Sequence, residues 1–139
     1  MDNGSIILQV SHLVYLFSAL LAWQKGYKLF SLLLFGMIIV SIANHYVQET
    51  LMLENPLLEY FEKTLVVGVF ITTAIQFRPY IRYTWILFIL SFIFFLVGNI
   101  SYYSVGGRNE YFIYHTIWHF GTGLVLYRIL QRAEDMNKT

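Results

Sequence analysis

The stretch YFIYHTIWHFGTGLVLYRIL, residues 111–130, is apolar enough to cross a lipid bilayer, yet it carries two histidines. His115 and His119 are four residues apart, so on a helix they share one face. A polar ring in hydrocarbon costs free energy unless it has a partner. The stretch therefore predicts a membrane-spanning helix whose two histidines serve a ligand or a hydrogen-bonding group.

The composition of the whole chain indicates an integral membrane protein. The chain has 139 residues, of which 58% are hydrophobic and 12% are charged. A soluble domain carries about 25% charged residues. The formal net charge is +1 and no basic run is present, which argues against a nucleic-acid partner. Because cysteine is absent, disulfides and thiolate metal sites are excluded. The N-terminus lacks a basic segment and a cleavage site, so we expect its first apolar stretch to be a retained helix.

Hydropathy and loop residues predict five membrane spans. A span needs about 20 largely apolar residues, and the breaks between them contain charges, glycine or proline. The expected fold is an all-α bundle of five transmembrane helices. It forms a single domain over residues 1–131, followed by a polar cytoplasmic tail over 132–139. The expected spans are 5–24, 28–47, 58–77, 81–103 and 110–130.

The distribution of lysine and arginine predicts the orientation of this bundle. Seven of these residues fall on one side and two on the other. The positive-inside rule then places the N-terminus outside and the C-terminus in the cytoplasm of a plasma (inner) membrane. The inner residues are Lys25, Lys28, Arg78, Arg82, Arg128, Arg132 and Lys138, and the outer ones are Lys63 and Arg108.

With this orientation, the polar residues of the spans converge at one depth, near the outer face. Ser41 and His45 are four residues apart and share a face of the second span. Three neutral histidines, His45, His115 and His119, leave an open fourth position on zinc, which is typical of catalytic sites. A nearby carboxylate could hold and deprotonate a bound water, and Glu62 is the best-placed acid.

These residues resemble the motifs of the CREST superfamily, which includes alkaline ceramidases, adiponectin receptors, haemolysin-III-like proteins and myomaker-like proteins. YHTIWHFGTG is similar to the H-x-x-x-H element of that family's last helix, and SIANH to its Ser-x-x-x-His element. EYFEKTLVVG resembles the acidic element of its third helix. The resemblance implies that His45, His115 and His119 bind Zn2+, while Glu62 and Ser41 hold the zinc-bound water.

The resemblance also implies a function, namely zinc-dependent hydrolysis of an amide or ester bond in a lipid-like substrate that enters from the bilayer. Two departures stand out. The family has seven helices where five are expected here, and it usually has Asp where this chain has Glu62. Loss of two helices before the last one would preserve the direction of that helix. The longer arm of Glu62 would let its carboxylate bind the metal directly.

Several alternatives stay open at the level of sequence. His12 is interpreted as a packing residue or a partner of a ligand, and Glu59 or Glu49 could replace Glu62. The same histidines would also suit a non-catalytic protein with a structural zinc, acting in assembly or membrane remodelling. A haem held between His12 and His45 is a third reading. Three histidines favour zinc over iron or manganese, and five helices are few to enclose a lipid, so the sequence allows a homodimer.

Two glycines of the last span, Gly121 and Gly123, are expected to let neighbouring helices approach closely.

Overall fold

The computed structural model describes residues 3–51, 53, 55–82, 84–103 and 108–137, and these residues form helices joined by short turns, with no strand among them. The prediction of an all-α fold is confirmed. The elements are α1 (Asn3–Ser11), α2 (Val14–Gln24), α3 (Lys28–His45), the π-helix η1 (Tyr46–Thr50), α4 (Pro56–Gln76), α5 (Arg78–Ile81), α6 (Trp85–Tyr103) and α7 (Arg108–Asn137).

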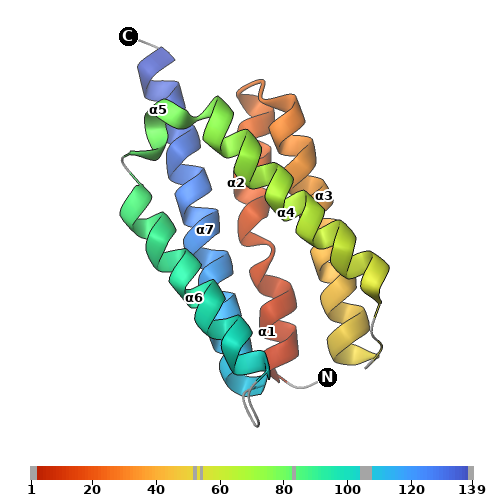
Figure 1. The fold of residues 1–139 in the computed structure, drawn as a ribbon. Helices are drawn as coiled ribbons and strands as arrows, with labels where there is room; N and C mark the ends of the chain where they lie inside the picture. The colour runs from red at the N-terminus through yellow and green to blue at the C-terminus, as the bar shows by residue number, and fades with distance from the viewer. Residues whose placement is uncertain (1–2, 52, 54, 83, 104–107, 138–139) are drawn as a thin grey trace.

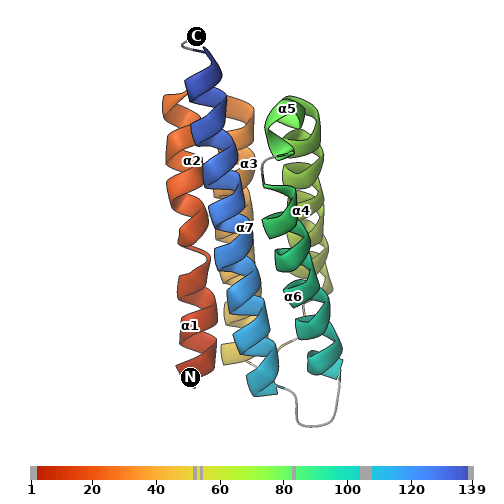
Figure 2. The same ribbon diagram turned by 90° about the vertical axis from the view of Figure 1, so that its left-hand side faces the viewer.

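The long helices alternate in direction, so the two ends of the chain lie at opposite ends of the molecule (Figure 1). Helix α3 packs between α2 and α4, and α7 packs against α1, α2 and α6. Figure 2 shows α4, α5 and α6 on one side and α1, α2 and α7 on the other. Helices α1 and α2 follow one another along a single line, as one interrupted rod (Figure 1).

The turns follow from their residues. Gly26 closes α2 with a φ of 82°, a left-handed conformation that glycine adopts without steric cost, and α3 begins two residues later. Pro56 opens α4, where its missing N–H is not needed, and the side chain of Asn55 accepts a hydrogen bond from the Leu58 N–H. Pro79 lies in the short helix α5, just after α4 has ended.

The predicted spans locate the helices but miss three details. The first span is broken at His12 and Leu13, the segment 78–81 forms the separate helix α5, and α7 continues to Asn137. The expected tail is therefore helical as far as residue 137, while Lys138 and Thr139 lie outside the described residues. Ala133 is fully buried, which explains why α7 continues past the predicted end at residue 130.

The break in the first rod has a local cause. In a continuous helix the Leu8 carbonyl would accept from the His12 N–H, but here that N–H turns to the Gln9 carbonyl, at 3.4 Å. The Leu8 carbonyl instead accepts from the Ser11 hydroxyl, at 2.6 Å, and from His12 Nδ1, at 2.9 Å. Side chains that bond backbone carbonyls in this way compete with the helix and bend it.

Two apolar clusters lie above and below a polar layer. The larger one fills the half of the bundle nearer the C-terminus and includes Phe30, Leu34 and Ile129. The smaller one consists of Leu8, Tyr111 and Phe112. Between these clusters along α1, α2 and α7 lie buried histidines, including His12 and His119. The fold thus isolates its polar groups from both ends.

Among the described residues, two segments are long and apolar enough to cross a membrane, Ile6–Gln24 and Lys28–Gln48. By length and composition alone, these two segments are weak evidence for association with a membrane.

Candidate metal centre

Three histidines from different helical rods meet in the polar layer. His12 lies at the break between α1 and α2, His45 ends α3, and His119 lies on α7. One nitrogen from each ring can be chosen so that all three lie within 4.8 Å of one another. Two nitrogens bound to one tetrahedral zinc ion are about 3.4 Å apart, so the three rings would have to move closer together to share an ion. Three buried histidines therefore form a group that could bind a metal ion.

The orientation of the His12 ring is set by the broken helix. Its Nδ1 lies 2.9 Å from the Leu8 carbonyl, which can only accept, so Nδ1 carries the proton. Its Nε2 then has a free lone pair, and it faces the Ser41 hydroxyl at 2.6 Å. A ring nitrogen that donates to a backbone carbonyl is typical of a metal-binding histidine, and a metal ion at Nε2 would take the place of the Ser41 contact.

An acid lies on the other side of Ser41. The Ser41 hydroxyl donates to Glu62 Oε1, and the side-chain amide of Asn44 donates to Glu62 Oε2, at 2.6 Å. The same Oε1 lies 3.8 Å from His45 Nε2. The Glu62 side chain is 16% exposed, whereas that of His45 is 3% exposed. Glu62 thus lies between the buried histidines and the surface of the bundle.

Counting protons shows that this chain of contacts needs one proton more than a neutral histidine and a serine hydroxyl supply. The contacts Leu8–His12, His12–Ser41 and Ser41–Glu62 each need one proton, but a neutral imidazole and a hydroxyl together supply two. When Ser41 donates to an ionised Glu62, the lone pairs of His12 Nε2 and Ser41 Oγ face each other. Either a proton on the Glu62 carboxyl, which lets Ser41 donate to His12 Nε2, or a metal ion beside Nε2 would remove this repulsion.

The fourth histidine, His115, lies beside the group of three. Its ring centroid is 4.6 Å from that of His119 and 5.3 Å from that of His45. Both nitrogens of His115 and both of His45 are buried without a hydrogen-bond partner. Buried polar atoms are rarely left unpaired, and a metal ion could pair with one nitrogen of each ring. The structure thus brings together the predicted ligands His45, His115 and His119, and it places beside them His12, which the sequence analysis interpreted as a packing residue or a partner of a ligand.

Glu59 and Glu49 are the other acids considered for the role of Glu62. The Glu59 carboxylate lies 2.5 Å from Lys63 Nζ in an ion pair on the surface, where the Glu59 side chain is 42% exposed. Glu49 belongs to η1, and its side chain lies outside the described residues. Of these acids, Glu62 is the one that the structure places beside the histidines.

The haem reading is not supported by this arrangement. The ring centroids of His12 and His45 are 5.1 Å apart, and that of His119 is 3.9 Å from His12. A porphyrin between His12 and His45 would need these two rings to lie further apart than they do.

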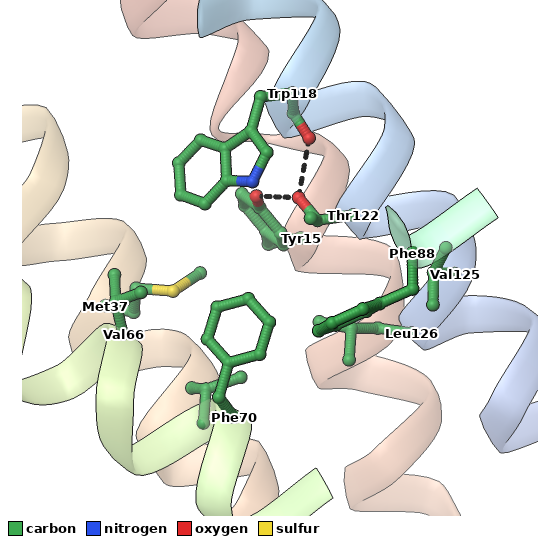
Figure 3. A pocket seen from close by; sticks show the side chains of 10 residues that line it. Tyr15, Met37, Val66, Phe70, Phe88, Trp118, Thr122, Val125 and Leu126 are labelled. Carbon is green, nitrogen blue, oxygen red and sulfur yellow. Dashed lines mark hydrogen bonds between the residues drawn. The ribbon is translucent and has the colours of Figure 1, made fainter. Parts of the chain in front are cut away.

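An apolar pocket lies next to the histidines, lined by residues from α2, α3, α4, α6 and α7. Its cavity volume is about 20 Å3, which is room for about one water molecule. Trp118, Tyr15 and Thr122 lie close together on one side of it, where Thr122 bonds both the Tyr15 hydroxyl and the Trp118 carbonyl (Figure 3). The Trp118 ring centroid lies 5.2 Å from that of His115. The pocket thus borders the candidate metal centre.

The sequence analysis did not predict that the rod formed by α1 and α2 contributes residues to the site. It treated His12 as a packing residue or a partner of a ligand, and it assigned no role in the site to Asn44 or Ser11. Helical spacing shows which residues of one helix share a face, but not how that face is turned toward other helices. The adjacent polar pair Ser11–His12 within an apolar span was the available signal.

No protein-family model, no curated protein and no solved structure matches the chain.

Proposed function

We propose that the chain is a membrane-spanning, zinc-dependent hydrolase that cleaves an amide or ester bond of a lipid-like substrate. The observation that carries this proposal is the buried group of His12, His45 and His119, with Ser41 and Glu62 in contact with it. The resemblance of the SIANH, EYFEKTLVVG and YHTIWHFGTG motifs to the CREST superfamily supports the hydrolase class.

The exposed surface of the helices supports a five-span bundle in a membrane. Long helices present large apolar side chains outward, including Phe17 (67% exposed), Ile39 (68%), Ile75 (77%) and Ile100 (71%). Water-soluble monomers rarely expose extended apolar surfaces of this kind. The excess of lysine and arginine on one side supports an outer N-terminus and a cytoplasmic C-terminus.

Each polar residue has a part in the proposed reaction. Zinc, when bound, supplies Lewis-acid chemistry and makes water acidic enough to ionise near neutral pH. His12, His45 and His119 would hold it. Glu62 accepts the proton of the attacking water and returns it to the leaving group. Ser41 and Asn44 orient the Glu62 carboxylate through hydrogen bonds to its two oxygens.

The apolar pocket supports the choice of substrate. It borders the histidines through Trp118 and Tyr15, and its other walls are formed mainly by Phe70, Phe88 and aliphatic side chains. Burial of apolar surface against such walls would stabilise an acyl chain by about 25 cal/mol per Å2, once the cavity of about 20 Å3 has opened to admit it. The scissile carbonyl would then lie toward the histidines.

A non-catalytic protein with a structural zinc is the second candidate, and His115 is the observation that favours it. Its two unpartnered nitrogens lie beside the group of three. A fourth histidine ligand would close the coordination of zinc, as structural sites do.

The variant Glu62→Gln separates the two candidates. If the protein is a hydrolase, the glutamine side chain cannot accept the proton of water, so hydrolysis of lipid amides and esters should fall by about 100-fold or more. The zinc content should stay near that of the wild type. Detergent-purified protein would be assayed for both, with Glu59→Gln, one turn away on the surface, as the matched control. Wild-type protein that binds zinc and hydrolyses none of these substrates would favour the structural site.

A further inference from the structure

We propose that Ser11, together with the Leu8 carbonyl, is a positioning residue that holds His119 and His12 in the tautomers that direct both Nε2 atoms toward one metal ion. This inference rests on the metal site of the proposed function. It assigns a role to the first helical rod that neither the helical spacing nor the resemblance suggested.

The contacts of Ser11 fix the proton on His119. The Ser11 hydroxyl lies 2.6 Å from the Leu8 carbonyl and 2.6 Å from His119 Nδ1. A carbonyl oxygen can only accept, so the single hydroxyl proton of Ser11 is directed to Leu8. The contact with His119 then requires that Nδ1–H donates to Ser11 Oγ. His119 Nε2 is left without a proton and can bind a metal.

The Leu8 carbonyl fixes the proton positions of two histidines, that of His12 directly and that of His119 through Ser11. It accepts from His12 Nδ1 directly, at 2.9 Å, and receives the Ser11 hydroxyl that orients His119. Because the helix breaks at this point, both lone pairs of the carbonyl are available to side chains. One backbone oxygen thereby sets the tautomers of two ligands, and the ring centroids of these ligands lie 3.9 Å apart.

All three members of this arrangement are buried. Ser11 is 2% exposed, His119 is 1% exposed and Leu8 is fully buried, so water cannot replace a lost hydrogen bond without entering the core. Removing the hydroxyl would leave His119 Nδ1–H without an acceptor, and the ring would be free to turn. Outer partners of metal-binding histidines change metal affinity by about 10–100-fold when they are removed.

The test is the zinc affinity of the full chain, measured by competition with a chromophoric chelator in detergent. Ser11→Ala should bind zinc about 10–100-fold more weakly than the wild type, whereas Ser11→Thr, which keeps the hydroxyl, should bind within a few-fold of it. Ser18→Ala is the matched control, because Ser18 is equally buried but donates to the Gly123 carbonyl, at 3.2 Å, and touches no histidine. Equal zinc affinity in wild type and Ser11→Ala would overturn the inference.

A second measurement avoids any change of sequence. Long-range 1H–15N correlation spectra of the zinc-loaded wild type should show His12 and His119 as Nδ1–H tautomers, bound through Nε2. Zinc bound to Nδ1 of either ring would overturn the inference even if Ser11→Ala failed to fold. Absence of zinc binding by the wild type would instead contradict the proposed metal site itself, so the two failures can be told apart.

Discussion

His12 and His115 are rival third ligands beside His45 and His119. The helical spacing and the resemblance favour His115, whereas the geometry groups His12 with the other two. His12 Nδ1 donates to the Leu8 carbonyl, which leaves Nε2 unprotonated and in contact with the Ser41 hydroxyl. His115 is close but has neither nitrogen anchored.

Two alanine variants decide between these residues. His12→Ala should lose zinc affinity by more than the 10–100-fold typical of outer partners, since a direct ligand is removed. His115→Ala should keep close to one zinc per chain. Elemental analysis of detergent-purified protein, with circular dichroism to verify helix content, gives the answer. The opposite ranking would restore the ligand set of His45, His115 and His119.

The residues of the site were only partly predictable. His45, Glu62 and Ser41 could be placed at one depth because hydropathy and charge indicate how far along each span a residue lies. The role of Ser11 could not be predicted, because it depends on a carbonyl set free by a break that contains neither glycine nor proline.

At the scale of the elements, both irregularities of the first half of the chain coincide with a histidine. The first rod breaks at His12, and α3 passes into the π-helix η1 directly after His45. Short π segments frequently occur at functional sites. The approximate positions of the long helices were predictable, because runs of about 20 apolar residues separated by loop residues are a strong signal. The interruptions of these helices were not predictable, because they arise from individual side-chain contacts.

Helix α7 approaches α2 closely at Gly123, and substitution there should disturb the packing around the break. A Cβ atom at Gly123 would lie 2.7 Å from Val14 Cγ1, and the branched Val14 side chain has little rotameric freedom. We expect Gly123→Ala to lower the free energy of unfolding by about 1–3 kcal/mol through overpacking. Thermal unfolding in detergent would measure this loss.

The control for this prediction is another helical glycine. A Cβ atom at Gly68 would meet nothing closer than Leu33 Cδ2, at 3.8 Å. Gly68→Ala should therefore be neutral or stabilise by up to about 1 kcal/mol, the difference in helix propensity. If Gly123→Ala behaved in the same way, the close approach of α2 and α7 would be wrong.

At the scale of the whole molecule, the proposed orientation can be tested directly, because the chain contains no cysteine. A single cysteine at Leu51, between η1 and α4, should react with a membrane-impermeant maleimide in intact cells. A single cysteine at Lys25, between α2 and α3, should react only after permeabilisation, because the positive-inside rule places that turn in the cytoplasm. Labelling of Lys25→Cys in intact cells would invert the orientation, and labelling of both would contradict a bundle that spans the membrane.

The three grouped histidines come from distant parts of the chain, so they meet only after α7 has packed against the other helices. His12 and His45 come before α4, whereas His119 lies on α7. Since a chain emerges from its N-terminus and its early parts fold first, a nascent chain holds at most two of the three histidines in place until α7 has joined the bundle. The proposed metal binding is thereby coupled to the docking of α7, and a chain truncated before α7 has no group of three histidines.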